Sequence, residues 1–295
     1  MSYQNPQIPE GINVTAEHPL KDFFFMLLGV TGIGLALLVV LLVLAEWLVQ
    51  FIPFETEQAL VEQDWFESAI PGATTDNSDS TDNTDNSNRD GANTHRETEQ
   101  YLNQLAQALL QKTPPPEGIE VVVHYIDSDT VNAFATLGGH IVVFRGLLDA
   151  LPNENAVAML LAHEIAHIKH RDPIIAAGRG LTVGLALASI VGASDNSLVH
   201  SLLGQMNFLT AMAFSRDQEQ QADDDALASV LAYYGHVNGA DGVFIALEEH
   251  SFSPPAFLSS HPVTADRISN VHYFQQQYAS SIPVVPKPVF NTDKQ

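Results

Sequence analysis

The chain has 295 residues, with 12 lysines and arginines against 35 aspartates and glutamates, and its formal net charge is −23. A chain this acidic lacks the basic face that nucleic-acid binding requires, so we expect no nucleic-acid partner. It contains no cysteine, which excludes disulfides, cysteine nucleophiles and thiolate metal sites, and leaves His, Asp and Glu as metal ligands.

The first predicted element is a membrane anchor over residues 23–45, a stretch without a charged residue. As a helix rising about 1.5 Å per residue, it exceeds the roughly 30 Å hydrocarbon core of a bilayer. A cleaved signal peptide is the alternative, but the apolar run is too long and the residues before it are not basic. Lys21 precedes the anchor and the next basic residue is Arg89. The positive-inside rule therefore predicts a single-pass protein whose residues after the anchor are extracytoplasmic, on the periplasmic side of the inner membrane if the source is bacterial.

Two segments separate the anchor from the folded domain. Residues 46–71 form an amphipathic juxtamembrane segment with aromatic side chains suited to headgroup depth. Residues 72–96 are rich in Asp, Asn, Ser and Thr and cannot bury apolar area, so we expect a disordered acidic linker that tethers a mobile folded domain. The folded domain is predicted to cover residues 97–278 and to begin with a helix. Residues 1–22 form an N-terminal tail before the anchor, and residues 279–295 form an irregular C-terminal tail after the domain.

The domain itself is predicted to be of the α+β class, mainly helical with a small β-sheet. Residues 119–126 and 140–144 are rich in β-branched and aromatic residues and predict two strands, with Gly138 and Gly139 turning between them. Asn153 is a good N-cap for a long helix that ends near Arg171, before Asp172 and Pro173. The apolar residues 181–193 are short for a membrane span and fit a buried helix beside residues 198–214; a hairpin that dips into the membrane is the alternative.

The long helix carries the motif His163-Glu164-Ile165-Ala166-His167. Two histidines four residues apart lie on one face of a helix, close enough to share a metal ion. Glu164 lies about 100° around the helix from His163, so it is placed to reach a water molecule beside the metal. This is the H-E-x-x-H arrangement of zinc hydrolases. Its flanks are apolar, and burying these polar groups is costly unless they are paired or bind a metal.

The site needs a third protein ligand. His170 is one possibility, although a surface histidine explains it equally. The other is Glu219, on a predicted helix over residues 215–228 where Asp223 lies four residues further on the same face. Glu219 as ligand, with Asp223 accepting a hydrogen bond from a ligand histidine, completes a site of two histidines and one glutamate.

These patterns together resemble the gluzincin peptidases that include the HtpX-type membrane peptidases and the CAAX prenyl protease. The likeness rests on four stretches that occur in the family's order: Asn132 to Ala135 followed by Gly138 to Leu148, the motif from His163 to His167, Ser215 to Asp223, and His261 to Ile268. The resemblance covers roughly residues 100 to 275. The chain differs from HtpX-type and prenyl-protease members, which have several membrane spans, in having one clear span.

The resemblance implies a zincin-type fold with one zinc ion per chain, bound by His163, His167 and Glu219. It makes Glu164 the general base and Asp223 the residue that orients a ligand histidine. It also implies that the strand around His140 to Phe144, with His140, Ile141 and Val142, is the edge to which an extended substrate adds as a β-strand.

Two further residues are candidates near the site. His261 is expected to stabilise the transition state or to bind zinc as an extra ligand; an exposed position at a helix N-terminus is the alternative. Arg267 is expected to pair with an acidic residue near the site.

The predicted function is hydrolysis of peptide bonds in protein or peptide substrates by a membrane-anchored zinc metalloendopeptidase, with protein quality control as a candidate role. The alternative is a membrane-tethered binding or chaperone-like protein whose zinc site is structural or latent.

Overall fold

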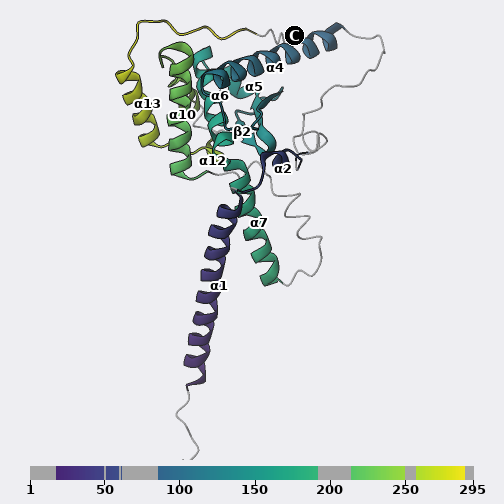
Figure 1. The fold of residues 1–295 in the computed structure, drawn as a ribbon, viewed down its shortest axis with the longest axis vertical. Coiled ribbons are helices and arrows are strands. Elements are labelled where there is room, and N and C mark those ends of the chain that lie inside the picture. Colours follow the sequence, from purple (N-terminus) through teal and green to yellow (C-terminus); the bar gives the residue numbers. More distant parts are fainter. Residues whose placement is uncertain are drawn as a thin grey trace, which may run out of the picture.

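The computed structural model describes residues 18–49, 51–59, 61, 86–191, 214–249 and 257–289. It confirms the predicted class, a mainly helical domain with a small sheet. One long helix, α1, projects from this domain like a stalk (Figure 1).

Helix α1 covers Pro19–Val49 and is long and apolar enough to cross a membrane. It extends beyond the predicted anchor at both ends. Large apolar side chains are exposed along most of its length. Water does not favour so extended an apolar surface, which supports the prediction that lipid covers it.

Two helices follow the anchor. The short helix α2, Phe54–Ala59, lies against the domain, where Phe54 joins the main core. Helix α4, Asn86–Lys112, begins well before Glu97, where sequence periodicity predicted the first helix of the domain. Residues 60 and 62–85, which include most of the predicted linker, lie outside the described residues.

The sheet has three strands: β1, Val122–Ile126; β2, Ala133–Thr136; and β3, His140–Phe144. Their order is β1-β3-β2, with β1 parallel and β2 antiparallel to β3. The predicted substrate edge at His140, Ile141 and Val142 is therefore wrong, because both sides of β3 are already paired. Strand β2, which was not predicted, occupies one edge of the sheet instead.

The predicted glycine turn is present, but it joins β2 to β3. It forms the short 3₁₀ helix η1, Leu137–Gly139, in which Gly138 and Gly139 have φ angles of 73° and 83°. A Cβ on Gly139 would lie 1.9 Å from the Glu120 carbonyl oxygen. This position therefore needs glycine for both its backbone angle and its close approach to a neighbouring chain segment.

Helix α6, Glu154–Lys169, forms the centre of the domain and follows the short helix α5, Arg145–Ala150. Asn153 caps α6 as predicted, accepting a hydrogen bond of 2.9 Å from the Ala156 amide. Almost every residue of α6 is buried, against α4, the sheet and the later helices.

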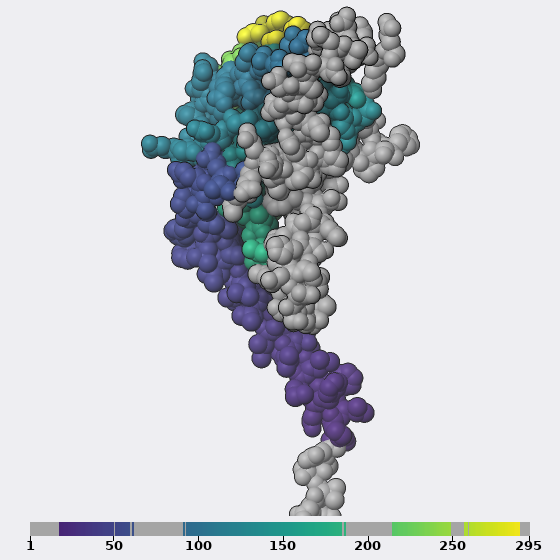
Figure 2. All heavy atoms as spheres, turned by 90° about the vertical axis from the view of Figure 1, so that its right-hand side faces the viewer, coloured from purple at the N-terminus to yellow at the C-terminus, as the bar shows by residue number. Residues whose placement is uncertain are grey.

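Helix α7, Asp172–Val191, starts directly after α6 and leaves the domain beside α1 (Figures 1 and 2). Arg171, with φ of 62°, forms the sharp corner between α6 and α7. Val49 packs with Ile174 and Ile175 in a small apolar cluster. Arg179 on α7 forms a 2.8 Å ion pair with Glu46 on α1. Residues 198–213 of the predicted neighbouring helix lie outside the described part of the chain.

The remaining helices are α10, Arg216–Tyr234; α11, Gly242–Glu249; α12, Phe257–Ser260; and α13, Ala265–Gln277. Ser215 caps α10 with a capping box, and Gly235 ends it in the left-handed conformation. Helix α10 packs along α6, and α13 packs on α10. The α6–α10 pair brings the two predicted site motifs together.

Candidate active site

Helix α6 places His163 and His167 on one buried face. Their Nε2 atoms are 3.1 Å apart and their ring centroids 4.7 Å apart. The two rings therefore lie on one face of the helix, as their spacing of four residues predicted, and both direct Nε2 to the same point.

Helix α10 brings Glu219 to that point. Its Oε1 atom is 3.5 Å from His167 Nε2, and its Oε2 atom is 3.6 Å from His163 Nε2. Glu219, Ala222, Asp223 and Ala226 are all buried, so the face of α10 that carries Glu219 and Asp223 points inward. The structure therefore brings all three predicted ligands together.

His261 completes the group from the end of α12. Its side chain is fully buried, so the alternative of an exposed imidazole is wrong. Its Nδ1 atom is 3.2 Å from His163 Nε2 and 3.0 Å from Glu219 Oε1. Among the described residues, the ligand atoms of His163, His167, Glu219 and His261 all lie within 4.8 Å of one another.

The far nitrogens of the two α6 histidines face carboxylates. His163 Nδ1 is 3.0 Å from Asp223 Oδ1, and His167 Nδ1 is 2.8 Å from Asp172 Oδ2. A neutral imidazole that donates from Nδ1 presents a lone pair at Nε2. Two such lone pairs 3.1 Å apart, with a carboxylate beside them, repel one another unless a proton or a metal cation lies between them. This donor set fits zinc, which prefers nitrogen and oxygen ligands of this kind.

The pKa values of the two histidines are shifted in opposite directions. Burial lowers the pKa of His163 and favours the neutral form that binds metal. Burial acts the same way on His167, but hydrogen bonds to Asp172 and Glu219 outweigh it and raise its pKa to about 9. A metal ion must displace a proton from His167, so metal binding weakens as the pH falls.

Arg267 balances the negative charge of two buried acids, Asp223 and Glu219, and so pairs with acidic residues near the site as predicted. Its Nε and Nη2 atoms donate to the two oxygens of Asp223 at 2.6 and 2.9 Å, and Nη1 lies 2.5 Å from Glu219 Oε2. Burial alone would raise the pKa of Asp223, but the hydrogen bonds from Arg267 outweigh it and the pKa is lowered. Both acids therefore remain ionised and able to face cationic or proton-donating partners.

Glu164 lies beside the cluster without being part of it. It is fully buried, and its Oε2 atom accepts a 2.7 Å hydrogen bond from the Ala135 amide of β2. Its Oε1 atom is 3.5 Å from His261 Nε2. The side of the buried strand β2 that faces away from β3 therefore runs past the glutamate that the motif identifies as the base.

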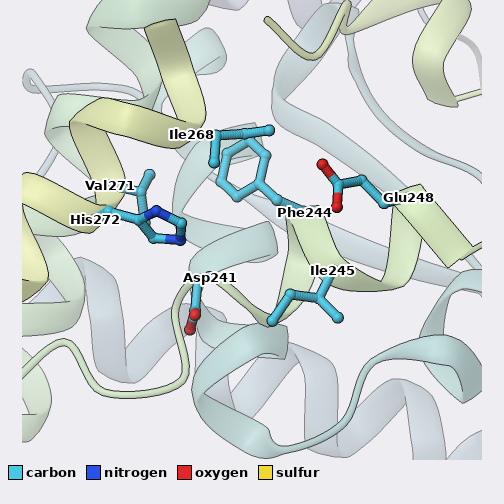
Figure 3. Close-up of a pocket in the computed structure, with 7 residues that line it drawn as sticks. All are labelled: Asp241, Phe244, Ile245, Glu248, Ile268, Val271 and His272. Atoms are coloured by element: carbon cyan, nitrogen blue, oxygen red, sulfur yellow. The ribbon is translucent and has the colours of Figure 1, made fainter. Parts of the chain in front are cut away.

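Two recesses lie near α13. The larger, of about 250 Å³, adjoins Glu219 and is lined by Phe214, Arg216, Asp217, Glu219, Gln220, Pro262, Thr264, Asp266 and Arg267. The smaller, of about 60 Å³, lies between α11 and α13 and is shown in Figure 3. Its lining includes none of the four clustered side chains, whereas Glu219 lines the larger recess. The larger recess therefore belongs to the candidate active site.

Sequence reasoning missed four residues at the site. Asp172 holds His167 and itself accepts a hydrogen bond from Gln218. Phe214 stacks on His167 at a centroid distance of 4.0 Å, and Phe257 stacks on His261 at 4.5 Å. Asp172 had a signal, as an acid five residues after the second motif histidine, but it was interpreted only as a helix end.

His170, the other candidate for the third ligand, does not join the cluster. It points to Asp225 instead, with an Nε2–Oδ2 distance of 3.1 Å, at the partly exposed edge of α10. His170 is partly exposed and is not one of the clustered ligand residues.

Comparison with known proteins agrees with this site. The pattern of peptidase family M48 matches residues 92–275. The chain is 32% identical over 154 residues to the mitochondrial metalloendopeptidase OMA1 of Schizosaccharomyces pombe, and 28% over 189 residues to the beta-barrel assembly-enhancing protease of Escherichia coli K12. It is 30% identical over 203 residues to the protease HtpX of Legionella pneumophila strain Philadelphia 1.

These alignments cover 50%, 58% and 54% of this chain, respectively. The chain spans 45% of the OMA1 relative, 37% of the E. coli relative and 70% of the HtpX relative. The family pattern covers more than half of the chain and includes every residue of the cluster. The chain therefore belongs to peptidase family M48.

Proposed function

We propose that this protein is a membrane-anchored zinc metalloendopeptidase that hydrolyses peptide bonds within protein substrates. One observation carries the proposal. The Nε2 atoms of His163 and His167 converge with Glu219 on one buried point, and Glu164 lies next to that point with both oxygens directed at other groups.

His163, His167 and Glu219 would hold the zinc ion, with Asp223 and Asp172 fixing the two imidazoles from behind. When bound, zinc supplies a Lewis acid that polarises the scissile carbonyl and lowers the pKa of water towards about 7. These side chains serve to keep two imidazole nitrogens and one carboxylate oxygen directed at the same place.

Glu164 is the proposed general base. Its carboxylate takes a proton from the attacking water and passes it to the leaving amine. The Ala135 amide holds one of its oxygens at 2.7 Å, which fixes the orientation of the carboxylate. His261, 3.5 Å from the other oxygen, is the proposed group that stabilises the developing oxyanion; a fourth metal ligand is the alternative role.

The proposed substrate site is the outer edge of β2. In an antiparallel pair, alternate residues direct their N–H and C=O groups away from the partner strand. Ala135 does so, because its amide points to Glu164 and not to β3. An extended peptide that pairs with this edge would pass directly by Glu164.

The arrangement at the membrane is also a proposal. Residues 23–45 of α1 would contact the lipid bilayer, and Lys21 supports a cytoplasmic N-terminus with the catalytic domain on the extracytoplasmic side. Polypeptides close to the membrane, including misfolded ones awaiting quality control, are the proposed substrates.

The test uses full-length protein purified in detergent and compares the wild type with Glu164→Gln. Casein cleavage and zinc content are measured on both, with Glu117→Gln, at an exposed position, as the matched control. We expect zinc in all three proteins and cleavage only by the wild type and the control, because the base contributes to turnover and not to metal binding.

Zinc in all proteins with cleavage in none would contradict the proposal. It would support the alternative, a binding or chaperone-like protein with a latent zinc site. Cleavage that persists in Glu164→Gln would remove Glu164 from the role of base.

A further inference from the structure

Glu57 is a buried acid in the segment that leads from the membrane anchor to the domain. It lies on α2, and only 2% of it is exposed. A buried carboxylate is costly unless its oxygens are bonded and its charge is balanced. Both oxygens of Glu57 are bonded, one to the turn between β2 and β3 and the other to the corner between α6 and α7.

The first oxygen holds the turn between β2 and β3. Glu57 Oε1 accepts a 3.1 Å hydrogen bond from the amide of Gly138 in η1. This turn closes the hairpin whose outer strand carries Ala135, the residue bonded to Glu164. The position of the turn therefore sets the position of the β2 edge relative to the proposed base.

The second oxygen holds the corner between α6 and α7. Glu57 Oε2 accepts from Arg171, 3.0 Å from Nε and 2.8 Å from Nη2. Arg171 has a left-handed backbone, unusual for a residue with a side chain, and the next residue is Asp172. Asp172 in turn holds His167 Nδ1 at 2.8 Å. The corner that Arg171 forms thus presents the carboxylate that orients a proposed zinc ligand.

The same segment surrounds Arg171 on other sides. Arg171 Nη2 donates to the Ile52 carbonyl at 3.0 Å, and its guanidinium lies 5.6 Å from the centre of the Phe54 ring. Phe54 packs so closely on the turn that a Cβ on Gly139 would lie 3.0 Å from the ring. The contact is therefore a fitted interface of the juxtamembrane segment, with Glu57 at its polar centre.

We propose that Glu57 is a positioning residue through which the juxtamembrane segment holds both the β2 edge and the Arg171–Asp172 corner in their working arrangement. The inference rests on the proposed function and assigns part of the active-site geometry to a segment outside the region that matches the family, residues 92–275. The residues after the anchor are then part of the catalytic unit.

The experiment uses full-length protein in detergent and compares Glu57→Gln with Glu55→Gln, the same change at an exposed position of the same helix. Two quantities are measured per metal-loaded molecule: kcat/KM for a peptide substrate, and the visible absorption spectrum after Co²⁺ replaces zinc. The cobalt spectrum reports the geometry of the ligands, which a general loss of stability would not change in the molecules that remain folded.

We expect Glu57→Gln to lower kcat/KM roughly tenfold and to shift the cobalt spectrum, because residues that orient metal ligands commonly contribute this much. Glu55→Gln should match the wild type in both. Glu57→Gln leaves the Arg171 charge unbalanced and can prevent folding. The double variant Glu57→Leu/Arg171→Met removes both charges, and we expect it to fold and to show the same two defects.

The proposal is overturned if the folded single or double variant keeps the wild-type kcat/KM and cobalt spectrum, or if Glu55→Gln changes them as much. The cobalt spectrum needs no turnover. If the wild type proves inactive, the proposed function fails, while an altered spectrum in the Glu57 variants still supports the positioning role.

Discussion

Each of the two α6 histidines is held from behind by an aspartate of a different helix. His163 faces Asp223 of α10, and His167 faces Asp172 at the start of α7. Each aspartate is held in turn, Asp223 by Arg267 and Asp172 by Gln218. Helix α6 supplies the spacing of the two rings, but the neighbouring helices decide which way each ring faces.

Replacing Asp172 tests this support at a position that lies outside the cluster itself. We expect Asp172→Asn to lower zinc affinity about 10- to 100-fold, because the amide holds the imidazole less firmly and lowers its basicity. Competition with a chelator measures the affinity. Asp225→Asn is the control, since Asp225 pairs with His170 outside the cluster. Equal affinities for the two variants would contradict the role of Asp172.

At the residue scale, the sequence predicted what depends on spacing within one helix. His163, Glu164 and His167 follow from one motif, and Glu219 with Asp223 from another. The residues it missed depend on how separate segments meet. Asp172 reaches His167 because Arg171 turns the chain sharply, and no helical periodicity encodes that corner.

At the scale of elements, helices were easier to predict than the sheet. The N-cap Asn153 and the shared face of Glu219 and Asp223 on α10 were predicted correctly because capping and periodicity act locally. Strand β2 was missed because its sequence, Ala-Phe-Ala-Thr, contains two alanines, which favour strands weakly. The parallel pairing of β1 with β3 was also not predicted, since pairing between distant segments leaves no periodic signal.

A histidine pair joins these two parallel strands. His124 Nε2 on β1 is 2.9 Å from His140 Nδ1 on β3, and both rings are partly buried. Burial, followed by the charge of His124, lowers the pKa of His140 from 6.5 to about 4. The strand pair therefore holds His140 in its neutral form at neutral pH.

This pair predicts acid sensitivity. As the pH falls from 6.5 to about 4, the unfolded chain takes up a proton at His140 before the folded protein does, so stability falls across that window. We expect the free energy of unfolding of His140→Gln to decrease over this pH window by on the order of 1 kcal/mol less than that of the wild type. Urea unfolding at several pH values measures it, with the exposed His272→Gln as control. If the free energy of unfolding of His140→Gln falls with decreasing pH as steeply as that of the wild type, His140 is not the source of the acid sensitivity.

At the scale of the whole molecule, the anchor packs against α7 where both helices leave the domain. The two helices leave the domain together, joined by the Glu46–Arg179 pair and the cluster around Val49 (Figure 1). Beyond Arg179, α7 continues with apolar residues, and Leu181 and Val183 are 44% and 41% exposed. Because α1 runs alongside at this level, we expect lipid to contact the exposed face of α7.

The absence of native cysteine makes this expectation easy to test, since a single introduced cysteine carries the only label. A fluorophore at Leu181→Cys in vesicles with quencher-bearing lipids should be quenched as strongly as one at Leu35→Cys on α1. A label at the exposed Tyr273→Cys on α13 should be quenched little. If Leu181→Cys behaves like Tyr273→Cys, α7 stays clear of the bilayer.

The docking of α2 changes the meaning of the acidic stretch. From the sequence, residues 72–96 were predicted to be a disordered linker between the membrane anchor and a mobile catalytic domain. In the structure the chain already contacts the domain at Phe54 and Glu57, before that stretch begins, and joins it again at α4. Helices α2 and α4, which precede and follow that stretch, thus both pack on the same domain, and the number of residues between them does not determine the height of the catalytic centre above the bilayer. A reporter protein inserted there would leave the reach of the peptidase unchanged.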